Sequence, residues 1–407
     1  MFIEEAVDRE LGHVRLPAAD RGLVQELCYG TVRWQVTLDW LIERRTPRHR
    51  PPHPVQLLAR LGLYQLFWLD RVPDHAAVNE TVEAARTFDF AGQAGFLNAL
   101  LRGYTREADA TRQLLQDLRT SDPALGWSHP RWLVDRWAAR LSPAELQTFL
   151  AWNNTPAVNY ARVNAIKADT GRLIETWRNE GVDYDFTRWE WVPENLVFRL
   201  RRHPPLERLE SFGRGWYYIQ DPSTVLSVAL LEPRPGERLL DLCAAPGGKT
   251  TLIAQWLDND GVIVATEPDA RRRRRLQENC DRLGADVKVG VATDPEAAGP
   301  FDAVLVDAPC SNTGVLRRRL EARWRLQPAE LVRSQLQQIE LLADAARRLR
   351  PGGRLVYSTC SVEPEENADV VKAFLAAHPG YRLTRSRQLD PARDGVDGAY
   401  VACLAAP

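Results

Sequence analysis

Two cysteines directly follow short apolar stretches in the C-terminal half of the chain. Cys310 comes three residues after the stretch 303–307, and Cys360 comes two residues after the stretch 353–358. Apolar runs of this length are typical of buried parallel strands. The carboxyl ends of such strands open onto one crevice, so we expect both thiols to face the same site.

A pair of thiols in one crevice indicates nucleophilic chemistry, because the thiolate is the reactive form of cysteine. Carbon 5 of cytosine, for example, is a poor nucleophile until a thiolate has added to carbon 6, after which the ring is an enamine that attacks a methyl sulfonium. A second thiol can assist release once the carbon-5 proton has been removed. The residues leave open whether Cys310 or Cys360 attacks. A buried, small apolar role is the alternative, and it is our interpretation of Cys28, Cys280 and Cys403.

A loop of small residues, DLCAAPGGKT at positions 241–250, stands between an expected strand and an expected helix. Its glycines allow close approach of the backbone to a ligand, and the helix N-terminus behind them offers unpaired N–H groups. The spacing matches neither the P-loop nor the Gly-x-Gly-x-x-Gly pattern. The loop predicts a cofactor site, with Cys243 as a packing or backbone contact, formed by Cys243, Ala244, Ala245, Pro246, Gly247, Gly248 and Lys249.

Two carboxylates are also expected at strand ends. Glu267 ends the second strand, about twenty residues after the loop, where an acid commonly bonds the ribose hydroxyls of a cofactor. A solvated acid is the alternative. Asp307 precedes Cys310 and is placed either to bond the amino group and ring nitrogen of a cytosine or to contact the cofactor; the residues do not decide between these.

Arginines follow the first of the two cysteines. Arg317 to Arg319, with Arg323-Trp324 close behind, suit phosphate contact and base stacking at the mouth of a site, and a solvated loop is the alternative. For the run Arg271 to Arg275 on an expected helix, we favour a solvated face.

The elements that position these residues are short strands alternating with helices from residue 238 onward, which indicates a parallel α/β sheet with crossover connections. The expected strands are 238–242, 261–267, 287–291, 303–307 and 353–358, and the expected helices are 250–256, 269–283, 328–349 and 363–377.

Upstream of this region, apolar residues recur at three- and four-residue spacings over residues 1 to about 120, so this part is expected to be helical. Residues 130–150 are again helical in pattern, and residues 160–212 mix short apolar stretches with one helix at 169–180. We expect three domains, at residues 1–122, 123–215 and 216–407.

The composition of the chain limits the class of protein, its location and its partners. The chain has 407 residues, 44% of them hydrophobic and 26% charged, as in ordinary globular proteins. No signal sequence or membrane-length apolar run is seen, so we expect a cytoplasmic monomer that does not bind a membrane. Six cysteines without metal-ligand spacing predict no metal site. A net charge of -1 gives no global sign of nucleic-acid binding.

Three strings together resemble the Sun-type RNA cytosine-C5 methyltransferases: DLCAAPGGKT, DAPCSNTGV and YSTCSVEPEEN. The likeness continues upstream into segments familiar from the NusB-like and linker domains of the bacterial enzymes that methylate small-subunit ribosomal RNA. These segments are Asp20-Arg21, residues 26–33, 75–80 and 95–102, Arg162-Val163-Asn164 with Lys167, and Gln220-Asp221-Pro222-Ser223.

The resemblance implies a Rossmann-like, S-adenosylmethionine-dependent methyltransferase domain preceded by an all-α NusB-like domain and a small α/β linker domain. It implies Cys360 as the nucleophile and Cys310 as the residue for product release, with the 243–249 loop, Glu267 and Asp307 on S-adenosylmethionine. The implied partner is small-subunit (16S) ribosomal RNA, unassembled or partly assembled. DNA cytosine methyltransferases attack instead with the cysteine of their Pro-Cys motif, which would nominate Cys310.

The sequence departs from this family's pattern at three places. Asn312 replaces the small residue usual after Cys-Ser, and Val291 stands where the family usually has an acid. The nearest acid is Asp294, which we take as the candidate for the adenine-side contact. Asp397-Gly398-Ala399-Tyr400 stands where Asp-Gly-Phe-Phe is common, a change expected to affect packing.

Two other classes of protein were considered. A non-catalytic RNA-binding or ribosome-assembly factor that keeps the fold is disfavoured by the retention of both cysteines and Lys249. A DNA cytosine methyltransferase is disfavoured by Cys360, since that mechanism needs no second thiol at a strand end.

Overall fold

The computed structural model describes residues 3–48 and 50–407 of the chain. It divides into two compact units, Met1–Thr155 with Leu316–Arg325, and Pro156–Val315 with Leu326–Pro407. None of the described helices is long and apolar enough to cross a membrane.

The first unit is helical, as its sequence predicts. Residues of α3 and α4 that recur every three or four positions, such as Leu38, Leu41 and Leu63, are fully buried in its core. Its helices are α1 (Ile3–Gly12), α2 (Ala18–Arg33), α3 (Gln35–Arg45), α4 (His53–Trp68), α5 (Asp74–Thr87), α6 (Ala94–Arg106), α7 (Ala108–Ser121), α8 (Pro123–Gly126), α9 (Arg131–Ala138), α10 (Pro143–Asn153) and α16 (Ala322–Arg325).

The segment around α16 corrects one expectation. The Arg323 side chain is fully buried and donates hydrogen bonds to Asn154 Oδ1 at 2.8 Å and to the Asn153 carbonyl at 2.9 Å. Burial lowers the pKa of Arg323 to about 9. Arg317 is also buried, with its guanidinium 4.3 Å from the centre of the Trp152 ring. Neither arginine lies in a solvated loop, so that interpretation is wrong for this pair, and both guanidinium groups contact the protein itself.

Arg323→Ala is expected to lower the free energy of unfolding by roughly 3 kcal/mol, because the buried carbonyl groups lose their donors. Arg325→Ala, on the same helix, is the matched control. Arg325 is exposed and pairs with Glu321 at 3.2 Å, so its loss should cost less than about 1 kcal/mol. Denaturant unfolding measures both. Weaker RNA binding by Arg323→Ala with unchanged unfolding would contradict the structural role.

The second unit contains a four-stranded antiparallel sheet with strand order β2-β3-β1-β4. One face buries Ala161, Val163 and Phe198 against Leu173 and Trp177. The mixed α/β expectation for this region is confirmed. The elements are β1 (Asn159–Val163), α11 (Thr170–Glu180), β2 (Asp183–Phe186), β3 (Val197–Arg202), α12 (Glu210–Gly213) and β4 (Tyr217–Ile219).

The expected domain boundaries at 122 and 215 stay predictions. Helices α8 to α10 belong to the helical unit, and β4 completes the small sheet.

A seven-stranded sheet forms the rest of the second unit, with strand order β10-β11-β9-β8-β5-β6-β7. Strands β5 to β9 run parallel, and β11 pairs antiparallel with β9 and β10. The strands are β5 (Arg238–Asp241), β6 (Val262–Thr266), β7 (Lys288–Gly290), β8 (Phe301–Asp307), β9 (Leu349–Thr359), β10 (Arg382–Leu389) and β11 (Ala399–Ala405).

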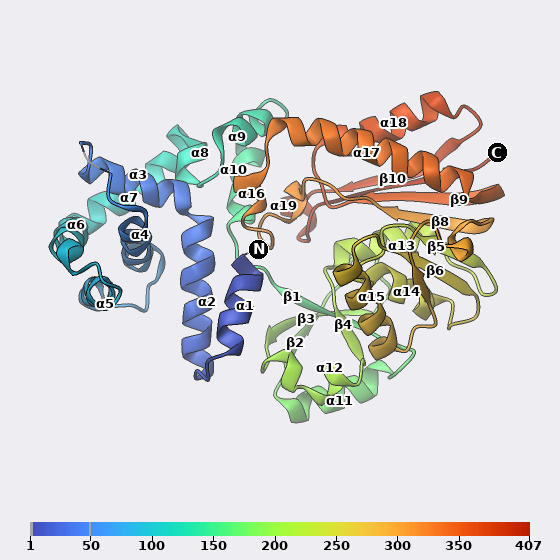
Figure 1. Ribbon diagram of the computed structural model, residues 1–407, viewed down its shortest axis with the longest axis horizontal. Helices are drawn as coiled ribbons and strands as arrows, with labels where there is room; N and C mark the ends of the chain where they lie inside the picture. Colours follow the sequence, from blue (N-terminus) through green and yellow to red (C-terminus); the bar gives the residue numbers. More distant parts are fainter. Residues whose placement is uncertain (1–2, 49) are drawn as a thin grey trace. The chain divides into compact units, whose positions relative to one another are not determined.

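Alternate residues of each strand face opposite layers of helices. Leu239 packs with α13 and α14, whereas Leu240 packs with α17 and α18, so helices cover both faces of the sheet (Figure 1). The helices are α13 (Val225–Leu231), α14 (Gly248–Trp256), α15 (Ala270–Leu283), α17 (Pro328–Arg347), α18 (Ala368–Ala377) and α19 (Pro391–Asp394).

Candidate active site

The strand order reverses between β5 and β8, and a cavity of about 550 Å³ lies at the carboxyl ends of these strands. This is where open parallel sheets bind ligands. The predicted residues that line the cavity are Cys243, Ala245, Lys249, Glu267, Asp307, Cys310 and Cys360.

The loops after β8 and β9 are joined by their backbones. Gly314 N–H donates to the Cys360 carbonyl at 3.0 Å, and Gly398 N–H donates to the Gly314 carbonyl at 2.8 Å. A Cβ atom on Gly314 would lie 2.7 Å from the Cys360 carbonyl oxygen. Only glycine therefore allows these loops to approach so closely. This contact brings the two cysteines together, as their strand-end positions predict.

The two sulfur atoms are 3.2 Å apart. Both cysteines are free and partly exposed to the cavity. The hydrogen bond with Cys360, together with shielding from water, raises the pKa of the Cys310 thiol well above its ordinary value.

A buried polar network stands behind the cysteine pair. Glu366 accepts hydrogen bonds from the backbone N–H of Ser311 at 2.8 Å and from its hydroxyl. The Ser361 hydroxyl lies 3.2 Å from the hydroxyls of both Ser311 and Thr313. Burial raises the pKa of Glu366. This network fixes the loops on either side of the thiols, and the sequence analysis did not single out Glu366.

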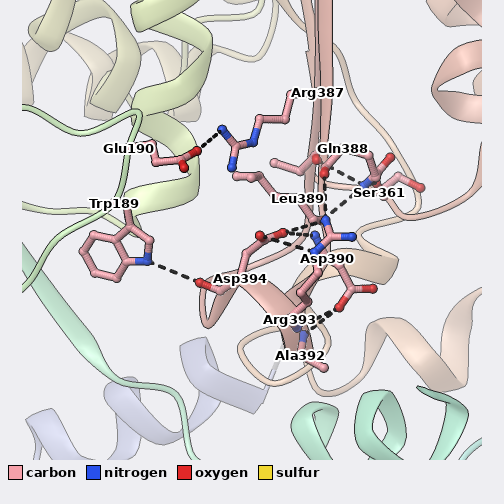
Figure 2. Close-up of polar contacts among 11 residues, drawn as sticks. Trp189, Glu190, Ser361, Arg387, Gln388, Leu389, Asp390, Ala392, Arg393 and Asp394 are labelled. Carbon is pink, nitrogen blue, oxygen red and sulfur yellow. Dashed lines mark hydrogen bonds and ion pairs between the residues drawn. The ribbon is translucent and has the colours of Figure 1, made fainter. Parts of the chain in front are cut away.

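Gln388 of β10 and Asn367, which directly precedes α18, hold the carbonyl group of Ser361, the residue after Cys360. Asn367 Nδ2 donates to the Ser361 carbonyl at 2.9 Å and to Gln388 Oε1 at 2.9 Å. Gln388 Nε2 also faces the Ser361 carbonyl, at 3.4 Å, and Figure 2 shows this side chain reaching from β10. Nearby, the Trp189 ring N–H donates to the Asp394 carbonyl at 3.3 Å, which ties the small sheet to α19 (Figure 2).

Lys249 and Asp307 form an ion pair beside the thiols. Lys249 Nζ donates to Asp307 Oδ2 at 2.7 Å. Burial alone would disfavour the ammonium group, but the Asp307 carboxylate outweighs it, and the pKa of Lys249 is raised. The site therefore keeps a positive charge at Lys249, in the cavity that Cys360 also lines.

The small-residue loop is shaped by packing more than by ligand approach. Gly247 has a φ of 104°, and a Cβ on it would lie 2.9 Å from Leu276 Cδ1. A Cβ on Gly248 would lie 3.0 Å from the Tyr218 ring. Neither glycine lines the cavity, nor do Ala244 and Pro246. The glycines let the loop pack against α15 and β4, and their contact with a cofactor stays a prediction.

The Arg162 side chain holds this loop in place by hydrogen bonds. It was not predicted as a site residue. It is fully buried and donates to the Gln220 side chain, to the Gly248 carbonyl and, at 2.9 Å, to Thr251 Oγ1. Burial lowers its pKa to about 10. The Arg-Val-Asn string was noted only as part of the family resemblance, and its contact with the loop depends on tertiary structure.

Glu267 lies at the end of β6 with 2% of its side chain exposed. Its carboxylate accepts a hydrogen bond from Asp269 N–H at 3.1 Å and pairs with Arg272 at 3.3 Å. Arg272 also lines the cavity. Most of the 271–275 run is exposed, as expected, but Arg272 has this additional role.

Asp294 does not line the cavity. Its Oδ2 atom accepts a hydrogen bond from Val291 N–H at 2.7 Å, within the turn after β7. On the same side, Ala292, Leu341 and Asp344 line the cavity instead. A helix residue such as Asp344 could not be assigned to the site from sequence, because nothing in its spacing differs from a solvated helix face.

Cys243 lines the cavity, and burial raises the pKa of its thiol well above the ordinary value. It therefore stays protonated, in agreement with a packing role. Among the described residues, no group of His, Cys, Asp and Glu is arranged to hold a metal ion.

Asp241, at the end of β5, is expected to make stability depend on pH. Burial raises its pKa to about 7. Its Oδ2 accepts from Thr250 Oγ1 at 2.7 Å, and its Oδ1 has no hydrogen-bond partner among the described residues. An unfolded aspartate ionises near pH 4. Stability from this group is therefore present below about pH 4 and is lost as pH rises towards 7.

Asp241→Asn removes the carboxyl group that ionises, so stability is no longer lost as pH rises. Asparagine keeps a side-chain oxygen that can accept the hydrogen bond from Thr250. The variant should gain up to roughly 4 kcal/mol in unfolding free energy at pH 8, and about half of that at pH 5.5. Denaturant unfolding at both pH values measures the gain. Equal gains at both would show that ionisation of Asp241 is not the cause.

Comparison with known proteins identifies the family of the chain. A family model described as 16S rRNA methyltransferase RsmB/F matches residues 228–404. The NusB family matches residues 1–106, and a ferredoxin-like domain of RsmF/B-like methyltransferases matches residues 129–201. Ribosomal RNA small subunit methyltransferase B of Vibrio vulnificus is 35% identical over 400 residues, which are 95% of this chain and 91% of that protein.

The chain belongs to the RsmB/F family of 16S rRNA methyltransferases. The resemblance seen in the sequence is thereby confirmed, as is the three-part fold with its Rossmann-like methyltransferase domain.

Solved structures agree with this assignment. The structure of PH0851 superposes with a TM-score of 0.79 at 26% identity, covering 97% of this chain and 92% of that one. A methyltransferase homolog from Pyrococcus horikoshii superposes with a TM-score of 0.61 at 29% identity, covering 70% of this chain and 98% of that one.

Proposed function

We propose that this RsmB/F family member transfers a methyl group from S-adenosylmethionine to carbon 5 of a cytosine in 16S ribosomal RNA, through a covalent bond between Cys360 and carbon 6. The observation that carries the proposal is the pair of thiols, 3.2 Å apart, at one cavity with the Lys249–Asp307 ion pair. Methyl transfer to a more nucleophilic atom would need no thiol at all.

The residues of the cavity suit S-adenosylmethionine. The nearly buried Glu267 carboxylate at the end of β6 is placed for ribose hydroxyls, and Leu341 with Ala292 offers an apolar wall for an adenine. When bound, this cofactor supplies a methyl group on a sulfonium. Asp294, which caps a turn, is not retained in the proposed cofactor site.

Cys360 starts the reaction by adding its thiolate to carbon 6. The new S–C6 bond takes up the sulfur electron pair, and the electrons of the C5=C6 double bond become available at carbon 5 for the methyl group. Bound S-adenosylmethionine would supply the methyl group to carbon 5, with its sulfur as the leaving group. Lys249 and Cys360 line the same cavity, so the ammonium group lies beside the reacting ring.

Asp307 and Lys249 hold the ring during addition. An Asp307 oxygen can accept from the cytosine amino group, while Lys249 donates to the ring, so that charge pushed into the ring by the thiolate is stabilised. Their mutual contact at 2.7 Å holds both side chains in place before the base arrives.

Cys310 completes the cycle by removing the proton from carbon 5. The C–H electron pair then restores the C5=C6 double bond, the C6–S bond breaks, and Cys360 leaves as a thiolate. The target must be unpaired or extruded, because a stacked base cannot offer carbon 6 to a thiol. We further propose that the substrate is free or partly assembled small-subunit RNA.

Radiolabelled methyl transfer to 16S rRNA from a strain lacking the enzyme tests this proposal, with bisulfite sequencing to locate the product. We expect one new 5-methylcytosine. Labelling without a bisulfite-resistant cytosine would exclude carbon 5. Absence of labelling with intact cofactor binding would favour a non-catalytic assembly factor, and labelling of duplex DNA alone would favour a DNA methyltransferase.

A further inference from the structure

Asn312 lies in the loop that follows Cys310 and lines the cavity. Its backbone has a φ of 62°, in the left-handed region that asparagine and glycine adopt more readily than other residues. Backbone geometry alone therefore allows either residue here. The side chain of asparagine needs another explanation, and its contacts provide one.

The orientation of the Asn312 amide is fixed by the Cys310 backbone. Its Nδ2 atom lies 2.9 Å from the Cys310 carbonyl oxygen. A carbonyl oxygen only accepts hydrogen bonds, so the NH₂ group must face it, and a flipped amide would place two oxygens together. The Oδ1 atom consequently faces the Cys360 sulfur, at 3.1 Å.

This orientation assigns the protons of the cysteine pair. Because Oδ1 cannot donate, the Cys360 S–H must point at Asn312. The Cys310 S–H is then the hydrogen that lies between the two sulfurs, 3.2 Å apart. A thiolate at Cys360 would face the lone pairs of Oδ1 and would lose this hydrogen bond, so the amide favours the neutral thiol.

We propose that Asn312 is a positioning residue that accepts the S–H of Cys360 and holds this thiol neutral and turned towards Cys310 until a base enters the cavity. The proposal rests on the proposed role of Cys360 as nucleophile. The charged groups that act on the thiol pair are Lys249, which opposes Asn312 by favouring the thiolate, and Glu366 behind Cys310. Asn312 thus makes Cys360 less reactive in the free enzyme, at a site whose other groups are arranged for attack on a base.

Alkylation of the free enzyme by iodoacetamide, without RNA or cofactor, tests this effect of Asn312 on Cys360. The thiolate attacks the reagent, an S–C bond forms, and iodide leaves. Mass spectrometry of tryptic peptides separates Cys360 from Cys310, since several arginines lie between them. Asn312→Gly, which suits the backbone, should alkylate at Cys360 about 5-fold faster at pH 7.5, the ratio expected for loss of one neutral hydrogen bond.

Asn195→Gly is the matched control. Asn195 has a φ of 59° and is exposed in the loop before β3, so this variant makes the same backbone change away from the site. Its Cys360 should alkylate at the wild-type rate. An equal acceleration in both glycine variants would overturn the proposal.

Asn312→Asp keeps an acceptor and adds a negative charge, so alkylation at Cys360 should be slower than in wild type, by about 5-fold or more. A loop that is merely loosened would react faster in both Asn312 variants. Opposite changes therefore support the proposal, and changes in the same direction, or none, overturn it. Because no methyl transfer is measured, the result is separate from the test of the proposed function.

Discussion

Cys360→Ala is expected to reduce methyl transfer by at least about a thousandfold, because no other group in the cavity replaces a thiolate at carbon 6. Cys310 is closest, but its raised pKa keeps it a neutral thiol. Alanine is smaller than cysteine and removes only the sulfur, so the loops held by Gly314 and Ser361 should keep their positions.

Radiolabelled methyl transfer measures the loss, and calorimetric titration with S-adenosylmethionine shows whether the cofactor site is intact. We expect its dissociation constant to stay within about twofold of wild type, since the loss falls on the chemical step rather than on cofactor binding. Cys28→Ala, in the helical unit, is the control and should keep full activity. Wild-type methyl transfer by Cys360→Ala would reject Cys360 as the nucleophile.

The convergence of the thiols was predictable from sequence because it follows from strand direction alone. Once 303–307 and 353–358 are assigned as parallel strands, their following residues must meet at one edge. In the structure, Asp307 is in register with Ser358 on the neighbouring strand, which brings the two loops together. The same reasoning placed Glu267 and Lys249 correctly at the cavity.

Features that depend on contacts distant in sequence were not predictable. Arg323 looks like a surface arginine because several arginines lie close to it in sequence. In the structure its buried guanidinium donates hydrogen bonds to Asn153 and Asn154. The strands β10 and β11 were missed because only the pairing of β11 with β9, and of β10 with β11, distinguishes them from loops. Strand β9 begins earlier than expected, at Leu349, because Pro-Gly-Gly within it reads as a break.

The environment of each thiol could not be predicted from the sequence either. Cys310 and Cys360 are alike in sequence, and the family resemblance ranked them without a physical reason. In the structure, the hydrogen bond to Cys360 and shielding from water raise the pKa of Cys310, and the ranking of the two cysteines stays a prediction. The departure at Asn312 was visible, but its contact with the Cys360 sulfur was not.

Cys310→Ala is expected to have the second large effect, a covalent protein–RNA adduct. Once Cys360 is bound to carbon 6 it is a thioether without charge or S–H. A thioether sulfur is a weaker hydrogen-bond acceptor than a thiol or thiolate sulfur, so the effect of Cys360 that raises the pKa of Cys310 is reduced once the adduct has formed. Its thiolate can remove the carbon-5 proton. Without it, release should slow by about 10²–10⁴-fold, the usual contribution of a general base.

Denaturing gels with labelled 16S rRNA measure the adduct. Cys310→Ala should give a shifted band that increases with S-adenosylmethionine, because methyl transfer makes addition difficult to reverse. The double variant Cys310→Ala/Cys360→Ala should give none. A shifted band in Cys360→Ala with Cys310 intact would reverse the two roles. Rapid turnover by Cys310→Ala without adduct would assign proton removal to another group. Asp307, which lines the same cavity, would then be the first residue to substitute in a test of that role.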